Sequence, residues 1–415
     1  MRFGVFFEIQ MPRPWQDDSE QRAFAEALEQ AELADRIGIQ YIWATEHHFL
    51  EEYAHSSAPE VFLAAVAGRT RRIRLGHGIR LMPPPYNHPA RVAECLATLD
   101  LVSGGRVEWG VGSSSSAAEI LGFGFDPHEK EAMADEATAE VAKMLTSSPY
   151  PGFEGRYFSM PARNVVPKPI QRPHPPLWTA CSKRQTIIRA AEQGVGALTF
   201  AFVNPNDARP WVEDYHQTFA ERCDPIGQEV NPRLAMVTGF GCADDASVAR
   251  ERFKAGQDFF GYALAYYYGT GRHTPGRDSI WSKYQEAGIE ADTGYGDATP
   301  FATPKELIER YRIFEDAGVD QVILMPQAGR NRHEDICEAL DLFGRAVFPE
   351  FLDRDEESEA RRMKRLEPAI DRARARITPP GEVETLEPIE AFGLRSKRAA
   401  SELATLLHKA PIEDK

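Results

Sequence analysis

The chain has 415 residues, 42% of them hydrophobic, which is enough for a large core in one α/β barrel or in two to three smaller domains. Its formal net charge of −15 at pH 7 argues against binding to the phosphate backbone of nucleic acids and to anionic membrane surfaces. The five cysteines are widely spaced without a CxxC pair, and no apolar run reaches the ~18 residues of a membrane span, so we expect a cytoplasmic protein without a disulfide framework or a structural zinc site.

Short apolar runs alternate with segments of helical periodicity along most of the chain. The expected strands, rich in β-branched and aromatic residues, cover 3–9, 41–45, 73–82, 106–112, 176–180, 197–202, 234–239 and 321–325. The expected helices cover 19–37, 59–70, 89–102, 129–146, 183–193, 206–222, 245–264 and 331–345. Eight strands alternating with eight helices favour an α/β fold of the (β/α)8 TIM-barrel type, and a doubly wound open sheet is the alternative.

Three segments interrupt or extend this pattern. Residues 148–176 are rich in proline and carry one hairpin signal, and residues 262–300 form a long insertion that would lie over the catalytic face of a barrel. We therefore predict a barrel domain over 1–346 and a charged helical C-terminal extension over 347–415. The two charged helical stretches of this extension cover 352–377 and 388–408.

Glu46, His47 and His48 stand where the second expected strand ends. Active sites of barrels form at the C-terminal ends of the strands. Because adjacent residues on an extended chain face opposite ways, the two imidazoles do not readily bind one metal ion, and no HExxH motif is present. We expect one histidine to point into the barrel mouth as a general acid or base, and a pair of ordinary polar residues at a strand end is the alternative.

Three further stretches offer groups that suit a flat, phosphorylated ligand. Gly76 and Gly78 would let a ring approach the backbone of the third strand, and barrel packing is the alternative explanation. Segment 109–127 places four serines at a strand end, and segment 178–186 places a helix start beside two cations. Both compositions suit an anion, although a flexible surface loop is the alternative for the first. Cys181 has no histidine close in sequence, so we interpret it as a small residue beside a ligand.

In this order, the four stretches resemble the bacterial luciferase-like flavin monooxygenases, a family that includes limonene and alkanal monooxygenases, over about residues 1–346. The matching pieces are EHHF at 46–49, GHGIRLMP at 76–83 with His88-Pro89, LVSGGR at 101–106, GVG at 110–112, Phe123-Gly124 and ACS at 180–182. The resemblance implies a barrel that binds reduced FMN at the strand C-termini. A separate flavin reductase would supply this cofactor, which would take up O₂ at its C4a position and oxygenate a substrate through the resulting peroxyflavin.

The resemblance also implies roles for individual residues. His47 matches the catalytic histidine, and Glu46 would lie beside the isoalloxazine ring. Gly78 and Ile79 match a non-prolyl cis peptide bond on which the ring rests. The cofactor phosphate would be bound by side-chain or backbone groups of five residues, with Lys183 or Arg184 nearby. These residues are Ser113, Ser114, Cys181, Ser182 and Gln185. Ser113 stands where several members carry a phosphate-binding arginine, and this departure leaves the deazaflavin F420 as an alternative cofactor.

The function expected from this resemblance is that of a two-component, FMNH₂-dependent monooxygenase acting with O₂ on a small hydrophobic substrate such as a monoterpene or cyclic ketone. Tyr266, Tyr267, Tyr268 and Trp281 would face the substrate, unless they only pack the insertion down or form a dimer interface. An F420-dependent oxidoreductase and a non-catalytic flavin-binding subunit are the alternatives, and the intact Glu46-His47 pair argues against the second. We also expect a homodimer or larger homo-oligomer, without a metal ion, nucleic acid or membrane as partner.

Overall fold

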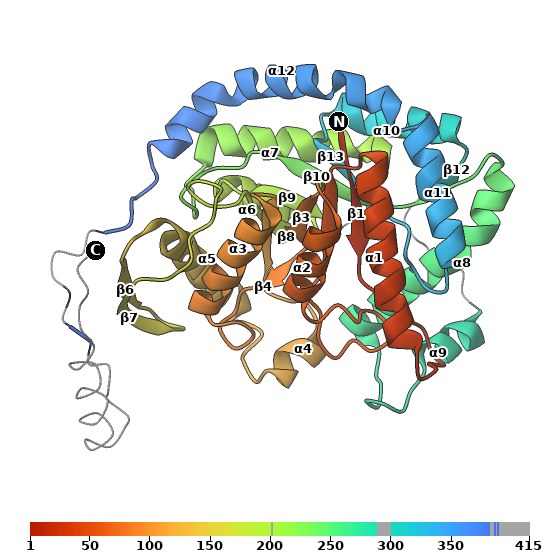
Figure 1. The fold of residues 1–415 in the computed structure, drawn as a ribbon, viewed down its shortest axis with the longest axis horizontal. Coiled ribbons are helices and arrows are strands. Elements are labelled where there is room, and N and C mark those ends of the chain that lie inside the picture. The colour runs from red at the N-terminus through yellow and green to blue at the C-terminus, as the bar shows by residue number, and fades with distance from the viewer. Residues whose placement is uncertain (201, 289–299, 382–385, 387, 390–415) are drawn as a thin grey trace, which may run out of the picture. The chain divides into compact units, whose positions relative to one another are not determined.

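The computed structural model describes residues 1–200, 202–288, 300–381, 386 and 388–389, and its centre is a closed barrel of parallel strands (Figure 1). The strands are β1 (Arg2–Phe7), β2 (Tyr41–Ala44), β3 (Arg74–His77), β4 (Arg80–Leu81), β5 (Val107–Gly112), β8 (Leu177–Cys181), β9 (Gly196–Thr199), β10 (Leu234–Gly239) and β13 (Gln321–Met325). The expected strand 73–82 is divided into β3 and β4. Pairing of β3 with both β2 and β5 closes the sheet, so the predicted eight-stranded barrel is confirmed and the open sheet is wrong.

Side chains of the strands alternate between the barrel interior and the layer beneath the helices, as the pleat requires. In β1, Phe6 packs inside the barrel, whereas Phe3 packs outside it. Trp43 and Trp178 fill the interior edge to face, with ring centroids 5.5 Å apart. A Cβ atom on Gly76 would lie 2.3 Å from the Trp43 ring, so barrel packing explains this glycine.

Helices surround the strands on the outside of the barrel. In chain order they are α1 (Ser19–Ile37), α2 (Pro59–Arg69), α3 (Pro89–Ser103), α5 (Lys130–Thr146), α6 (Arg184–Glu192), α7 (Ala208–Arg222), α10 (Pro304–Ala317) and α11 (His333–Ala346). The sequence prediction missed α10, although Thr303 and Glu306 form a capping box at its start. Helix α10 contacts both α7 and α11, and so occupies the ring position after β10.

The segment between β10 and α10 forms a structured insertion. Helix α8 (Ala246–Ala265), predicted at 245–264, packs against the two short strands β11 (Gly241–Cys242) and β12 (Phe301–Ala302). It is followed by a π-helical turn, η2 (Tyr266–Thr270), and by α9 (Ile280–Ala287). The part of the expected insertion at 289–299 lies outside the described residues.

Two smaller elements interrupt the barrel earlier in the chain. Strands β6 (Tyr150–Glu154) and β7 (Ser159–Arg163) form the antiparallel hairpin that the sequence predicted within 148–176. Helix α4 (Ala117–Gly122) follows β5 on the same side as the insertion (Figure 1).

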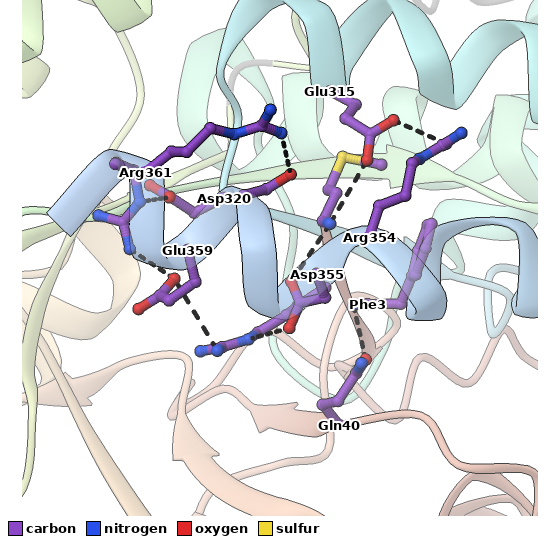
Figure 2. Close-up of polar contacts among 12 residues, drawn as sticks. Phe3, Gln40, Glu315, Asp320, Arg354, Asp355, Glu359 and Arg361 are labelled. Atoms are coloured by element: carbon purple, nitrogen blue, oxygen red, sulfur yellow. Dashed lines mark hydrogen bonds and ion pairs between the residues drawn. The ribbon is translucent and has the colours of Figure 1, made fainter. Parts of the chain in front are cut away.

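Helix α12 (Pro349–Arg374) crosses the N-terminal end of the barrel, away from α4 and α9 (Figure 1). Figure 2 shows its Arg354 beside Glu315 of α10, with which it forms an ion pair of 2.9 Å. Asp355 lies 3.2 Å from the amino group of Met1 and 2.9 Å from the guanidinium of Arg2. Farther along the helix, the Nε atom of Arg362 lies 2.6 Å from Asp320, which precedes β13. Ion pairs therefore join this charged helix to the barrel.

Helix α12 confirms the first of the two predicted charged stretches, and the second, 388–408, lies almost wholly outside the described residues. Residues 1–380 form one compact unit that includes α12. The division between barrel and extension at residue 346 stays a prediction. Among the described residues, no helix has both the length and the apolar character to cross a lipid bilayer.

Candidate active site

A cavity of about 550 Å³ opens at the C-terminal ends of the barrel strands. This volume lies within the range of about 300–1,000 Å³ that is typical of small-molecule and cofactor sites. Residues that follow β1, β2, β3, β5 and β8 line it, together with side chains of α5, α6 and the insertion. The cavity thus stands where barrel enzymes place their active sites.

His47 lies in the wall of this cavity between two buried carboxyl groups. Its Nδ1 atom is 3.1 Å from Oε1 of Glu119, and its Nε2 atom is 3.7 Å from Oε2 of Glu8. The hydroxyl of Tyr268 lies 3.3 Å from Nδ1 and 3.5 Å from Nε2. Glu119 also accepts a hydrogen bond from the backbone N–H of the residue after His47. These contacts fix the imidazole ring from several sides.

The two carboxyl groups set the protonation state of the histidine. Burial works to lower the pKa of His47, but the negative charges of Glu8 and Glu119 outweigh it and raise the pKa to about 9. Burial works to raise the pKa of Glu119, yet the charge and hydrogen bond of His47 hold it below its usual value. Burial raises the pKa of Glu8 in spite of His47. At neutral pH, His47 is therefore an imidazolium paired with the Glu119 carboxylate.

We expect turnover to fall as the pH rises through about 9, because His47 then loses the proton that it can donate. The change Glu119→Gln removes one of the two charges that favour the imidazolium, so the descending limb of the kcat/KM profile should move to lower pH. The same substitution at the exposed Glu334 of α11 should leave the profile in place. An alkaline limb that stays fixed in Glu119→Gln would contradict this assignment.

The raised pKa also links His47 to folding stability. The charged form of His47 stabilises the folded protein. This contribution is fully present below pH 6.5, the pKa of the histidine in the unfolded chain, and it is lost as the pH rises through about 9, its pKa in the folded protein.

The neighbouring His48 turns away from the cavity, as the predicted alternation requires. Its Nε2 atom lies 3.2 Å from Glu46, and its ring stacks on Tyr86 with centroids 5.8 Å apart. Glu46 is buried behind the cavity wall, where it accepts a hydrogen bond of 2.8 Å from the backbone N–H of Leu81 in β4. Its contact with a flavin ring stays a prediction. Among the described residues, no group of three or more potential protein ligands could hold a metal ion.

The peptide bond between Gly78 and Ile79 is cis, as the resemblance implied. Both residues line the cavity. Gly112 lies opposite, and a Cβ atom there would come within 2.5 Å of the Ile79 side chain. These three residues form a closely packed part of the wall.

Hydroxyl and backbone groups after two strands face another part of the cavity. Ser113 and Ser114 follow β5, Ser182 follows β8, and all three line the cavity. Their contact with a phosphate stays a prediction. Gln185 is exposed and does not line it. Thr186, one position later, carries a hydroxyl group and lines the cavity, and the sequence prediction missed it.

Cys181 lies on the outer face of β8. Its thiol is fully buried, where it contacts the carbonyl oxygens of Thr179 and Thr186, and burial raises its pKa to about 12. A buried thiol with a raised pKa is not activated as a nucleophile. Cys181 is not among the residues that line the cavity, so its position beside a ligand stays a prediction. Any contact with an anion would come from its backbone.

Two lysines line this region of the cavity, along with Arg189, which pairs with Glu131 and Asp135. Lys183 lines the cavity, whereas Arg184 turns outward and pairs with Asp214. Lys130, at the start of α5, also lines the cavity and donates a hydrogen bond from Nζ to the carbonyl oxygen of Ser114. No motif marks Lys130 in the sequence, because α5 brings it to the strand ends from a separate segment.

An aromatic wall faces the same cavity. It consists of the aromatic residues Tyr53, Phe200, Phe202, Phe260 and Tyr268, together with Leu264. Of the four aromatic residues expected at the mouth, only Tyr268 lines the cavity. Tyr266 donates a hydrogen bond to the carbonyl of Arg272, Tyr267 packs on the His273 ring, and Trp281 packs on Phe259.

The loop after β2 holds the insertion in place. Glu52 is fully buried and accepts hydrogen bonds from the backbone N–H groups of Ile280, Trp281 and Arg13. Glu51 accepts a further one, of 2.7 Å, from Gly276. A buried carboxylate with several N–H donors is a strong anchor, so the insertion that carries Tyr268 is tied to the loop that carries His47.

Comparisons with known proteins agree with this geometry. Residues 1–321 match the family model described as luciferase-like monooxygenase. The oxygenase component of the flavin-dependent trigonelline monooxygenase of Acinetobacter baylyi is 27% identical over 268 residues, which cover 63% of this chain and 71% of that protein. The F420-dependent glucose-6-phosphate dehydrogenase of Amycolatopsis mediterranei is 30% identical over 157 residues, or 37% of this chain and 47% of that protein.

Solved structures and other curated proteins extend these matches. The crystal structure of the monooxygenase RslO1 from Streptomyces bottropensis superposes with a TM-score of 0.68 at 26% identity, over 85% of this chain and 100% of that one. The chain spans about half the length, 54% and 47%, of two curated relatives from Sinorhizobium fredii. Because the family model matches most of the chain and the barrel carries its cavity at the strand C-termini, the protein belongs to the luciferase-like monooxygenase family.

Proposed function

We propose that the protein is the oxygenase component of a two-component flavin-dependent monooxygenase, which uses reduced FMN from a separate reductase and O₂ to oxygenate a small hydrophobic substrate. One observation carries this proposal: a single cavity combines the imidazolium of His47, a cationic region and an aromatic wall. The trigonelline monooxygenase relative is itself an oxygenase component. A homo-oligomer in the cytoplasm is part of the proposal.

The cationic region fits the phosphate of FMN. Lys130 and Lys183 provide two positive charges, and the hydroxyls after β5 and the N-terminus of α6 add hydrogen-bond donors. Burial lowers the pKa of Lys130 against the pull of Glu131, and the charge of Lys183 lowers it further. A bound dianion would relieve this repulsion. Ser113 stands where several family members carry an arginine, so the segment directly after β5 lacks that cation. In this proposal Lys130 provides the positive charge instead.

In this proposal, residues of the chain hold a proton for transfer and form the apolar part of the active site. When bound, reduced FMN supplies the electrons that activate O₂. His47 holds a proton between Glu8 and Glu119, ready for transfer at its Nε2 atom. Phe200, Phe202 and the other aromatic residues present an apolar surface that accommodates a hydrophobic substrate and excludes water.

This proposal is tested by supplying the protein with FMN, NADH, a flavin reductase and isotope-labelled O₂, together with a panel of hydrophobic ketones and terpenes. We expect mass spectrometry to find a product that has gained one labelled oxygen atom. Labelled product that forms equally well without the protein would contradict the proposal.

An F420-dependent oxidoreductase is the second candidate, because the family relatives include an F420-dependent dehydrogenase and Ser113 replaces an expected arginine. Flavin-dependent and F420-dependent relatives together support a flavin or deazaflavin cofactor for this chain. Fluorescence titration with FMN and with F420 separates the two. Tight binding of F420 without binding of FMN, in either redox state, would replace the monooxygenase proposal.

Lys130→Ala should weaken FMN binding by about 10- to 100-fold, because a hydrogen bond to a charged group contributes about 1.5–3 kcal/mol. Riboflavin, which lacks the phosphate, should bind this variant and the unchanged protein equally well. The matched control is Lys305→Ala on the exposed surface of α10, which should leave the FMN dissociation constant unchanged. Equal losses for FMN and riboflavin in Lys130→Ala would place the phosphate elsewhere.

A further inference from the structure

Two hydrogen-bond donors stand side by side in the cavity wall. His47 donates from Nδ1 to Glu119 at 3.1 Å, whereas the contacts of its Nε2 atom with the described residues are longer, 3.5 Å to Tyr268 and 3.7 Å to Glu8. The second donor is the hydroxyl of Tyr268, which lies near both ring nitrogens. Because an imidazolium carries a proton on each nitrogen, the ring cannot accept the hydroxyl proton, which stays available to a ligand.

The nearby carboxyl group of Glu8 is already engaged by other hydroxyls. Thr45 donates to Oε2 of Glu8 at 2.8 Å, and Tyr53 also hydrogen-bonds this carboxyl group. The Glu8 carboxylate accepts these hydrogen bonds and raises the pKa of His47 through its charge, so it offers a ligand oxygen no donor of its own. Beside it, His47 and Tyr268 are donors that face the aromatic part of the cavity.

The position of Tyr268 depends on the insertion and is fixed by packing. Its ring lies edge to face against Tyr53, with centroids 5.7 Å apart, and against His47 at 6.2 Å. The anchor at Glu52 ties the insertion to the loop between β2 and α2. Locked rotamers and a fixed loop are what a recognition site requires.

The surroundings of the two donors define the rest of the ligand. Phe260 packs on both Tyr53 and Phe202, with centroids 5.3 and 5.8 Å apart, and Leu264 lines the cavity beside them. Burying a donor in such a wall costs free energy unless an acceptor satisfies it. A purely hydrocarbon ligand would leave both donors unsatisfied, whereas a ligand with one acceptor oxygen would satisfy them.

We infer that the substrate is an apolar molecule with a carbonyl oxygen, which accepts hydrogen bonds from the Tyr268 hydroxyl and from the Nε2–H group of His47. The inference rests on the proposed function, since it assigns the aromatic part of the cavity to the substrate. Tyr268 is then a substrate-binding residue supplied by the insertion. Recognition of the carbonyl oxygen would discriminate ketones and aldehydes from hydrocarbons of the same shape.

Calorimetric titration of the full-length protein with two matched probes tests this inference without any turnover. The probes are 1-tetralone and tetralin, which share a carbon skeleton and differ in the carbonyl group. We expect the unchanged protein to bind the ketone at least about tenfold more tightly than the hydrocarbon, and Tyr268→Phe to lose about three- to tenfold of the ketone affinity, as one neutral hydrogen bond implies. Affinity for tetralin should not fall in this variant.

Tyr266→Phe is the matched control, because its hydroxyl bonds to the backbone of Arg272 outside the cavity. It should leave both affinities unchanged. Equal binding of the two probes by the unchanged protein would overturn the inference, even if oxygenation of hydrocarbons confirmed the monooxygenase proposal. A Tyr268→Phe variant that binds FMN more weakly but keeps its ketone affinity would also overturn it, because the donors would then serve the cofactor.

Discussion

Replacing His47 by Ala should lower turnover by about 10²- to 10⁴-fold, the range that a general acid or base contributes. The variant loses the proton at Nε2 but keeps Lys130, Lys183 and the groups after β5, so its dissociation constant for FMN should stay within about threefold of the original value. Product formation with a flavin reductase, and a separate FMN titration, measure the two effects independently.

The neighbouring histidine provides the control for this substitution. His48→Gln keeps a side-chain donor for Glu46 and changes a ring that stacks on Tyr86 outside the cavity. We expect this variant to keep most of its turnover. If His48→Gln lost as much turnover as His47→Ala, the assignment of His47 as the proton-transfer residue would be wrong.

Asp320→Ala should destabilise the protein by about 3 kcal/mol or more, because it removes one partner of a buried ion pair. The side chains of Asp320 and Arg362 are only 10% and 9% exposed, and Oδ1 of Asp320 lies 2.6 Å from Nε of Arg362. Burial raises the pKa of Asp320 in spite of this pair, so desolvation opposes the Coulomb attraction. The loss would arise because the substitution leaves a buried guanidinium with less compensation and the Leu234 N–H without its acceptor.

An exposed Asp–Arg pair of similar geometry is the control. Asp341 and Arg345 lie 2.9 Å apart on α11, with side chains 52% and 66% exposed. Asp341→Ala should change the free energy of unfolding by less than about 1 kcal/mol, since exposed pairs contribute little. Urea denaturation, at constant slope, gives both values. Similar small losses in both variants would show that α12 does not depend on this buried pair.

The sequence by itself determined the alternation of parallel strands with helices and the strand ends that carry the polar groups, whereas the closure of the sheet into a barrel was decided by the pairing of β3 with β5. Apolar runs at a spacing that allows a helix between them specify buried parallel strands, and the strand ends at His47, Ser113 and Ser182 carry polar groups. Alternation along a strand also separated His47 from His48, because this property depends only on local backbone geometry. The cis peptide bond between Gly78 and Ile79 was predicted from the resemblance to the family, not from the residues themselves.

Tertiary structure alone decided which other residues meet at the site. Glu8, Glu119 and Tyr268 surround His47, although they come from three segments far apart in the chain. No local pattern marks such residues, because loop and insertion paths are set by anchors such as Glu52 and not by helix or strand periodicity. The protonation state of His47 follows from the same packing, since two buried carboxyl groups outweigh its own desolvation only when the folded chain brings all three together.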